Sequence, residues 1–194
     1  LLLLTLMQLN GAKPGTIKNI ASSLIELPSQ LSKTLKMTDT YKAVAKLLFK
    51  RNSTLFLGRG LYFPIAREGA LKLKEISYIH AEAYPAGELK HGPLALIDEN
   101  MPVIALAPES EIAEKLISNL EEVKARGGTL YVMADPSVNM DVKTGSLVYM
   151  PKCDFFMTPI VYNIPLQILS YEVALLRGTD IDQPRNLAKS VTVE

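Results

Sequence analysis

Three ionisable residues in the first half of the sequence have the spacing of neighbours on one side of a helix. Glu68, Lys72 and Glu75 follow one another at intervals of four and three residues, which places them on one stripe of a helix that turns by about 100° per residue. A carboxylate one turn from an ammonium group stays ionised, and it can move a proton to and from carbon. An ordinary ladder of surface charges has the same spacing, so both interpretations stay open at this point.

An apolar stripe lies beside these charges on the same predicted helix. It consists of Ile65, Gly69, Leu73 and Ile76, which recur at intervals of three and four residues. Because this stripe should face the core, we expect the three ionisable side chains to lie at the boundary between core and solvent.

Both histidines of the chain fall in one short stretch, residues 79–93. Histidine carries protons near neutral pH, so His80 and His91 are candidates for acid–base work. The alternative is that His80 packs in the core and His91 caps a turn. We predict no metal site, because the His-Glu-x-x-His motif is absent and the prolines at 85 and 93 prevent ligand spacing along a helix.

Two further segments could meet a substrate. Gly58-Arg59-Gly60 follows a predicted strand, where backbone N–H groups can approach a ligand; the third glycine of a dinucleotide fingerprint is missing, and a plain tight turn explains the pattern equally well. The tail, residues 182–194, contains Lys189. A lysine near a chain end is usually a surface charge, but one that is desolvated over a crevice can attack a carbonyl.

The elements that must position these residues alternate along the chain. Apolar runs at 54–58, 103–107, 129–133 and 147–150, with 80–85 as a further extended piece, are separated by helical patterns. We therefore predict a three-layer α/β/α domain with a mainly parallel sheet over residues 37–178. Helices are expected at 16–36, from a cap at Thr38 or Asp39, from about 64, at 111–126 and at 159–177, the last ended by Gly178.

Composition restricts the function classes. The 194 residues are 48% hydrophobic and 21% charged, with a formal net charge of +1, which argues against a nucleic-acid surface. The leucine-rich opening is too short for a membrane span and has no basic flank, so we interpret it as the end of a buried helix in a fragment. Cys153, the one cysteine, cannot form an internal disulfide; we expect a cytoplasmic protein in which it is a small apolar residue.

Four segments together resemble the glucosamine-6-phosphate synthase family, also called glutamine–fructose-6-phosphate aminotransferases. They are Gly58-Arg59-Gly60, residues 70–78, residues 86–93 and the tail from 182 to 194. The resemblance implies an N-terminal glutaminase domain and two lobes of the sugar-isomerase (SIS) fold, of which this chain is similar to the second. Residues 1–13 would then end the preceding lobe, 14–36 form a connecting helix, 37–178 the second SIS domain, and 179–194 a tail over the active site.

The resemblance also implies roles for particular residues. Glu75 is similar to the base that moves a proton between C1 and C2 of the open-chain sugar, and Lys72 to a lysine that contacts the reacting sugar. His91 resembles a histidine that helps to open the ring and comes from the neighbouring subunit of a homodimer. Lys189 resembles the lysine that forms an imine with the fructose carbonyl, and Ala188 a backbone contact beside it.

The implied substrate is fructose 6-phosphate and the implied product glucosamine 6-phosphate, with no cofactor, metal, nucleic acid or membrane involved. The expected partners are the first isomerase lobe and the glutaminase domain, which supplies ammonia. In the family the phosphate is held by a Ser/Thr/Gln-rich loop of the first lobe. Nothing here matches it, since Ser22-Ser23 falls in a predicted helix and Thr144-Gly145-Ser146 precedes a strand. We therefore expect this chain alone to be inactive.

Three other functions compete with this interpretation. A regulatory module that binds a phosphosugar without catalysis would need neither Glu75 nor the tail lysine. A deglycase that acts on fructosamine phosphates should lack the ending Leu187-Ala188-Lys189. An unrelated structural α/β domain would leave the specific matches unexplained, so the enzyme is the favoured interpretation.

Overall fold

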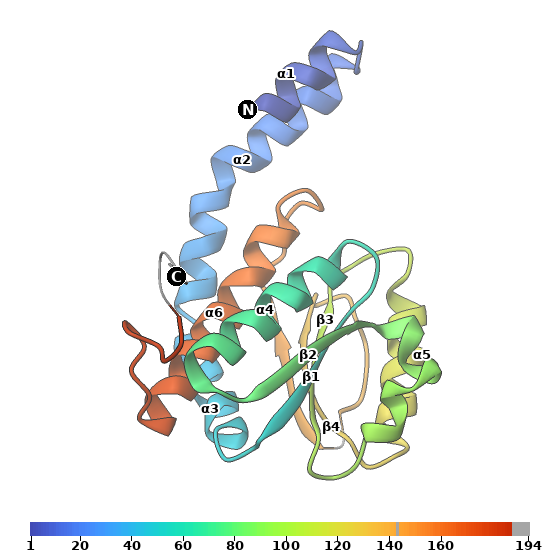
Figure 1. The fold of residues 1–194 in the computed structure, drawn as a ribbon. Coiled ribbons are helices and arrows are strands. Elements are labelled where there is room, and N and C mark those ends of the chain that lie inside the picture. Colours follow the sequence, from blue (N-terminus) through green and yellow to red (C-terminus); the bar gives the residue numbers. More distant parts are fainter. Residues whose placement is uncertain (143, 188–194) are drawn as a thin grey trace, which may run out of the picture.

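The computed structural model describes residues 1–142 and 144–187 of the chain. Its centre is a sheet of five strands in the order β2-β1-β3-β4-β5, and every neighbouring pair is parallel (Figure 1). The strands are β1 (Ser53–Gly58), β2 (His80–Pro85), β3 (Pro102–Ala107), β4 (Thr129–Ala134) and β5 (Gly145–Tyr149). The parallel sheet predicted from the apolar runs is confirmed, and so is the extended piece at 80–85.

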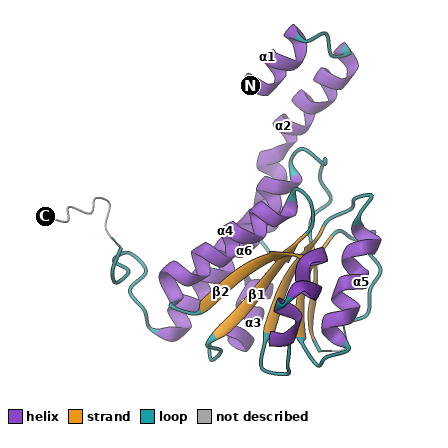
Figure 2. Ribbon diagram, turned by 45° about the vertical axis from the view of Figure 1, so that its right-hand side comes forward, coloured by secondary structure: helices purple, strands orange, loops and turns teal. Residues whose placement is uncertain are grey.

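Helices cover both faces of this sheet, which makes three layers (Figure 2). One face carries α3 (Thr38–Leu48), α4 (Tyr62–Ser77) and α6 (Thr158–Arg177). The other carries α5 (Ala113–Lys124) and two short 3₁₀ helices, η1 (Ala86–His91) and η2 (Pro93–Leu96). The predicted α/β/α architecture is therefore confirmed.

The strands are buried because successive side chains enter two different cores. In β1, Phe56 belongs to the core under α4 and α6, while Leu55 and Leu57 belong to the core under α5. All six residues of β3 are buried. A strand with apolar residues on both sides can only be stable between two layers, which is why a continuous apolar run is typical of this fold.

The helix α4 lies very close to its neighbours at Gly69. A Cβ atom at that position would be 2.7 Å from Leu166 Cδ1 on α6 and 3.1 Å from Phe56 Cε1 on β1. Leu73, one turn later, is fully buried. The apolar stripe predicted for this helix therefore does face the core, and the helix is fixed between the sheet and α6.

Outside these layers, α1 (Leu2–Leu9) and α2 (Pro14–Leu35) form a hairpin that projects from the body (Figure 1). The last turns of α2 rejoin the core, where Leu27 and Leu31 pack against the cluster under α6. The expectation of a buried first helix was wrong for this structure: none of the eight residues of α1, all of which are described, is buried. The reason is that α1 packs along the projecting part of α2 rather than on the body.

The start of α3 differs from the expectation. Neither Thr38 nor Asp39 caps the helix: the N-cap is Met37, without a side-chain hydrogen bond. The hydroxyl of Thr38 instead donates to the carbonyl of Leu35 at 2.6 Å, because α2 and α3 follow each other with almost no linker. At the other end of the domain, α6 stops at Gly178 in the left-handed conformation (φ 68°), as predicted.

The helix α6 is long and apolar enough, by length and composition, to cross a membrane, and 44% of its most apolar window is buried inside the protein. Core helices of globular proteins meet the same criterion. In this structure one side of α6, which includes Val161, Leu166 and Leu169, belongs to the core beside α3 and α4.

The tight contact at Gly69 predicts that even one added methyl group will destabilise the domain. Gly69→Ala should lower the free energy of unfolding by about 1–3 kcal/mol, because Leu166 and Phe56 must move to admit it. The matched control is Gly15→Ala on the exposed part of α2, where a Cβ meets nothing within 4 Å and helix propensity should add up to about 1 kcal/mol. Urea unfolding of both variants measures the difference. Equal effects would contradict the packing described here.

The environment of Cys153 predicts an unreactive thiol at neutral pH. Burial, followed by the negative charges of Asp135 and Asp154, raises the pKa of this thiol to about 11, and the thiolate is the nucleophile. The rate of modification by a thiol reagent should therefore rise about tenfold per pH unit from 7 up to 10. The same chain unfolded in urea is the control, and its rate should level off near pH 9. A plateau at that pH in the folded protein would disprove the shift.

Candidate functional site

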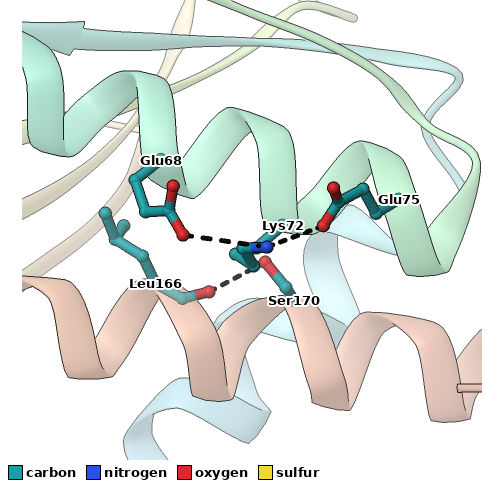
Figure 3. Close-up of polar contacts among 5 residues, drawn as sticks. All are labelled: Glu68, Lys72, Glu75, Leu166 and Ser170. Carbon is teal, nitrogen blue, oxygen red and sulfur yellow. Dashed lines mark hydrogen bonds and ion pairs between the residues drawn. The ribbon is translucent and has the colours of Figure 1, made fainter. Parts of the chain in front are cut away.

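The three ionisable residues of α4 form one hydrogen-bonded cluster (Figure 3). Lys72 Nζ donates to Glu75 Oε2 at 2.7 Å and lies 3.7 Å from Glu68 Oε1. The side chains of Lys72 and Glu75 are 35% and 28% exposed, so they lie at the boundary between core and solvent, as the helical pattern predicts. The same contacts are those of a charge ladder, and the geometry of this cluster alone does not exclude that interpretation.

The packing of α4 decides which way the cluster points. With Leu73 directed into the core, the residues beside it face α6, and Figure 3 shows Lys72 above Leu166 and Ser170 of that helix. The Ser170 hydroxyl donates to the Leu166 carbonyl at 2.8 Å, so it is engaged within its own helix. The ion pair therefore borders the junction of α4 and α6 and keeps one side open to solvent.

The ion pair changes the acid–base chemistry of Lys72. Its hydrogen bond to Glu75 raises the pKa of the Lys72 ammonium above the ordinary value; partial burial opposes this rise, and the charges of both glutamates reinforce it. Lys72 is thus a cation at neutral pH. A cation in this position holds one of the two oxygens of the Glu75 carboxylate in place.

The cluster lies far along α4 from the usual ligand crevice of an open α/β sheet. The helix starts at Tyr62, beside the carboxyl ends of the strands, and ends at Ser77, just before β2 begins at the opposite edge. Glu75 is in its last turn. A ligand that Glu75 contacts would therefore lie beside the end of α4 and not in the crevice at the carboxyl edge.

That crevice is present, with a volume of about 510 Å³, and Arg59, Gly60, Tyr62, Ser110 and Phe155 are among its lining residues. Gly60 has a φ of +57°, and a Cβ on Gly58 would lie 2.2 Å from the carbonyl oxygen of Tyr62. Gly60 therefore permits the left-handed backbone of a tight turn, and Gly58 allows the first turn of α4 to pack close to the end of β1. Arg59 Nη1 donates to Asn119 Oδ1 at 3.0 Å, which holds its guanidinium against α5.

The side chains of the two histidines are both exposed. His91 is at the end of η1, with its side chain 76% exposed and Nε2 3.7 Å from Glu88 Oε2. Because η1 packs with α5, His91 belongs to the face of the sheet opposite α4. His80 begins β2, and its side chain is 69% exposed beside Glu82, so the alternative that placed it in the core was wrong. A residue at the first position of a strand on the sheet edge has too few neighbours to be buried.

The remaining predicted site residues, Ala188 and Lys189, lie outside the described residues. The part of the tail that is described, up to Leu187, begins on the last turn of α4. Thr179 Oγ1 donates to the carbonyl of Ile76 at 2.5 Å, and the backbone N–H of Arg185 donates to the hydroxyl of Tyr78 at 3.0 Å. The sequence analysis missed Tyr78, because its left-handed backbone (φ 61°) is usual for Gly or Asn and carries no sequence signal in a tyrosine.

Within residues 1–142 and 144–187, no group of three or more His, Cys, Asp or Glu side chains is placed to hold a metal ion. The described residues thus offer a carboxylate held by an ammonium group. The tail begins beside it, at Thr179, which is hydrogen-bonded to the last turn of α4.

Comparison with known proteins places this geometry in a family. The model of the SIS domain matches residues 47–177. Two curated relatives are named glutamine–fructose-6-phosphate aminotransferase [isomerizing]: that of Pseudomonas syringae pv. tomato is 57% identical over the whole chain, and that of Pseudomonas aeruginosa is 58% identical over 93% of it. The chain spans 32% and 30% of the length of these two proteins.

A solved structure agrees with the sequence matches. The C-terminal domain of glucosamine-fructose-6-phosphate aminotransferase from Francisella tularensis superposes with a TM-score of 0.90 at 45% identity, over 93% of this chain and 51% of that one. The chain belongs to the SIS domain family and, within it, corresponds to the C-terminal SIS lobe of the glutamine–fructose-6-phosphate aminotransferases.

Proposed function

We propose that this chain is the second isomerase lobe of a longer enzyme that converts fructose 6-phosphate and glutamine-derived ammonia into glucosamine 6-phosphate. The single observation that carries the proposal is the Lys72–Glu75 ion pair, 2.7 Å long and open on one side, in a chain similar to proteins named for this reaction. The first SIS lobe and a glutaminase domain would be the partners within the same polypeptide, in a cytoplasmic homodimer.

In this proposal Glu75 is the carbon acid–base group. Lys189 condenses with the C2 carbonyl of the open-chain ketose to form an imine with loss of water, and ammonia then displaces the Lys189 amine, which leaves an imine of ammonia at C2. Glu75 then takes a proton from C1 and returns it to C2, which gives the 2-amino aldose. Lys72 engages Oε2 of the carboxylate, so we assign the proton transfer to Oε1.

The position of His91 supports the proposal of a second copy at the site. Its side chain is largely exposed and lies on the face of the sheet opposite α4, so it has no short route to the Glu75 of its own chain. The same exposure makes it available to the Glu75 region of a neighbouring subunit. Ring opening by His91 is therefore proposed to occur in trans.

The polar residues considered for the phosphate are engaged elsewhere. Ser23 donates to the carbonyl of Asn19 within α2 at 3.0 Å, and Thr144 donates to the carbonyl of Gly128 at 3.4 Å beside β5. Neither stands at a helix N-terminus, the usual place for a bound phosphate. The phosphate would then be held by the first lobe, and the substrate would lie between the two lobes.

The role of Glu75 predicts a large and specific loss of activity in the full-length enzyme. Glu75→Gln keeps the shape but cannot accept the proton, so conversion of fructose 6-phosphate to glucose 6-phosphate should fall by about 10²–10⁴-fold. Glu68→Gln is the matched control, because Glu68 is also paired with Lys72 on the same helix; it should keep activity within a few fold. Formation of glucose 6-phosphate, followed with a coupled dehydrogenase, measures both.

Equal activity of the Glu75→Gln variant and the unaltered enzyme would remove Glu75 from the mechanism. Equal losses in the two variants would show that the charge ladder matters only for structure. If the unaltered full-length enzyme bound fructose 6-phosphate but did not isomerise it, the chain would instead be part of a binding module.

The missing phosphate loop predicts that the 194-residue chain alone does not isomerise fructose 6-phosphate. Adding the first lobe in the same polypeptide should restore conversion, because the phosphate anchor supplies the binding energy that orients the sugar at Glu75. The same coupled assay checks this at millimolar substrate. Conversion by the lone chain at a rate near that of the full-length enzyme would show that the anchor lies within these residues.

A further inference from the structure

A hollow of about 300 Å³ lies between η1 and α5, on the face of the sheet opposite α4. Three of the side chains that line it are cations: Arg59, just after β1, Lys90 on η1 and Lys115 on α5. One is an anion, Glu122 of α5. The volume is at the lower end of the range that small ligands occupy. We call this cavity the α5 hollow.

The charges around the α5 hollow are not all available to a ligand. Lys90 Nζ lies 3.1 Å from Glu122 Oε1, so these two groups neutralise each other and link η1 to α5. Within residues 1–142 and 144–187, neither Arg59 nor Lys115 takes part in an ion pair. The two charges that remain, one on Arg59 and one on Lys115, are therefore both positive.

The guanidinium of Arg59 is fixed in place by the protein itself. Its Nη1 donates to Asn119 Oδ1 at 3.0 Å, and it lies against Gly87, where a Cβ would come within 2.8 Å of the same nitrogen. A guanidinium has five N–H donors. The bond to Asn119 is the one hydrogen bond that this guanidinium makes to the described part of the chain, so most of its donors are open to a ligand.

Asn119 supplies a further donor to the α5 hollow. Only 8% of this residue is exposed, and because arginine can only donate, the amide oxygen of Asn119 must face Arg59. Its Nδ2 donates to no group of the described residues and is not fully enclosed, so this amine reaches the cavity that Asn119 lines. The hydroxyl of Ser118, one residue earlier on α5, lines the same cavity.

We propose that the α5 hollow binds a phosphate group, either as free phosphate or as the head of a small phosphate ester. Near neutral pH such a group carries close to two negative charges, which match the positive charges of Arg59 and Lys115. Its oxygens accept paired bonds from a guanidinium and single bonds from an ammonium, an amide and a hydroxyl group. A carboxylate would leave one of the two cations unmatched.

The α5 hollow goes beyond the proposed function. Glu75 is on α4, which packs on the other face of the sheet, so a phosphate in the hollow would be separate from the Lys72–Glu75 pair. Binding at this site therefore needs no catalytic activity, and the two proposals can fail independently of each other.

The crevice at the carboxyl edge of the sheet distinguishes the two sources of phosphate. Arg59 lines both this crevice and the α5 hollow. The crevice also contains the apolar side chains of Leu61, Ile112 and Phe155. The organic part of a phosphate ester would lie against these side chains with its phosphate in the hollow, whereas free phosphate would not reach them.

The test is a titration of the isotope-labelled 194-residue chain with inorganic phosphate at constant ionic strength, followed by NMR. The backbone amide signals of Gly87, Ser118 and Asn119, and the Nε–H signal of Arg59, should shift and reach saturation. Sulfate, which is also a dianion, should compete for the site. Equal shifts with acetate, or shifts spread evenly over all lysine-rich surfaces, would overturn the proposal.

Four variants separate a built site from general attraction to positive charge. Arg59→Gln should weaken phosphate binding by about tenfold or more, because charge-assisted hydrogen bonds are lost. Lys115→Gln should weaken it by about two- to fivefold, because this ammonium group is exposed. Gly87→Ala keeps the net charge but displaces the guanidinium, so about a threefold loss or more is expected. Lys18→Gln, on the exposed part of α2, is the charge-matched control and should change the Kd by less than about twofold.

Unaltered binding in Gly87→Ala, or equal losses in Lys18→Gln and Arg59→Gln, would show that only the net charge matters and would overturn the site. Thermal unfolding shows whether each variant is folded. If Gly87→Ala did not fold, the comparison of Arg59→Gln with Lys18→Gln would still decide.

A second titration, with phenyl phosphate, identifies the source. Tighter binding than inorganic phosphate, with added shifts at Leu61 and Phe155, would support the site and identify a phosphate ester. Weaker binding without those shifts would support the site and identify free phosphate. The lack of a saturable shift with either probe would overturn the proposal.

Discussion

The burial of one face of α4 is the constraint on which the remaining structure depends. Gly69 and Leu73 bring this helix close to β1 and α6, and no other rotation of α4 would bury the same side chains. With that rotation fixed, Lys72 and Glu75 must lie at the edge of the α4–α6 contact, partly desolvated and partly open. The hydrophobic effect thus sets the position of the charged groups, and their ion pair adds little stability by itself.

The charged cluster on α4 and the crevice at the carboxyl edge of the sheet are two separate regions of the chain. The crevice at the carboxyl ends of the strands is the common ligand site in open α/β sheets, and here it is lined by Arg59, Tyr62 and Phe155. Glu75 lies at the opposite end of α4. Under the proposed function, the chemistry would therefore take place at a helix end beside the tail, whereas Gly58 and Gly60 serve the turn that starts the helix.

Two exposed regions of the lobe, at His91 and on α1, could contact other lobes or subunits. His91 is exposed on the α5 side of the sheet, and α1 projects with apolar side chains in solvent, among them Leu2 and Leu9. The chain matches about a third of the length of its curated relatives and half of a solved C-terminal domain. Under the proposed function, a substrate site assembled from several lobes and subunits would account for the separation of Glu75 and His91 on opposite faces of the sheet.

The sequence alone determined the three-layer α/β/α architecture and which side of α4 faces the core. Apolar periodicity shows directly which residues are buried away from water. The sequence also determined the boundary position of Glu68, Lys72 and Glu75, which follows from helix geometry. It could not determine that α1 projects from the body, that Met37 rather than Thr38 caps α3, or that Tyr78 adopts a left-handed backbone and holds Arg185. These depend on contacts between residues far apart in sequence, or on the lack of a partner surface, and only the tertiary structure specifies which groups are neighbours.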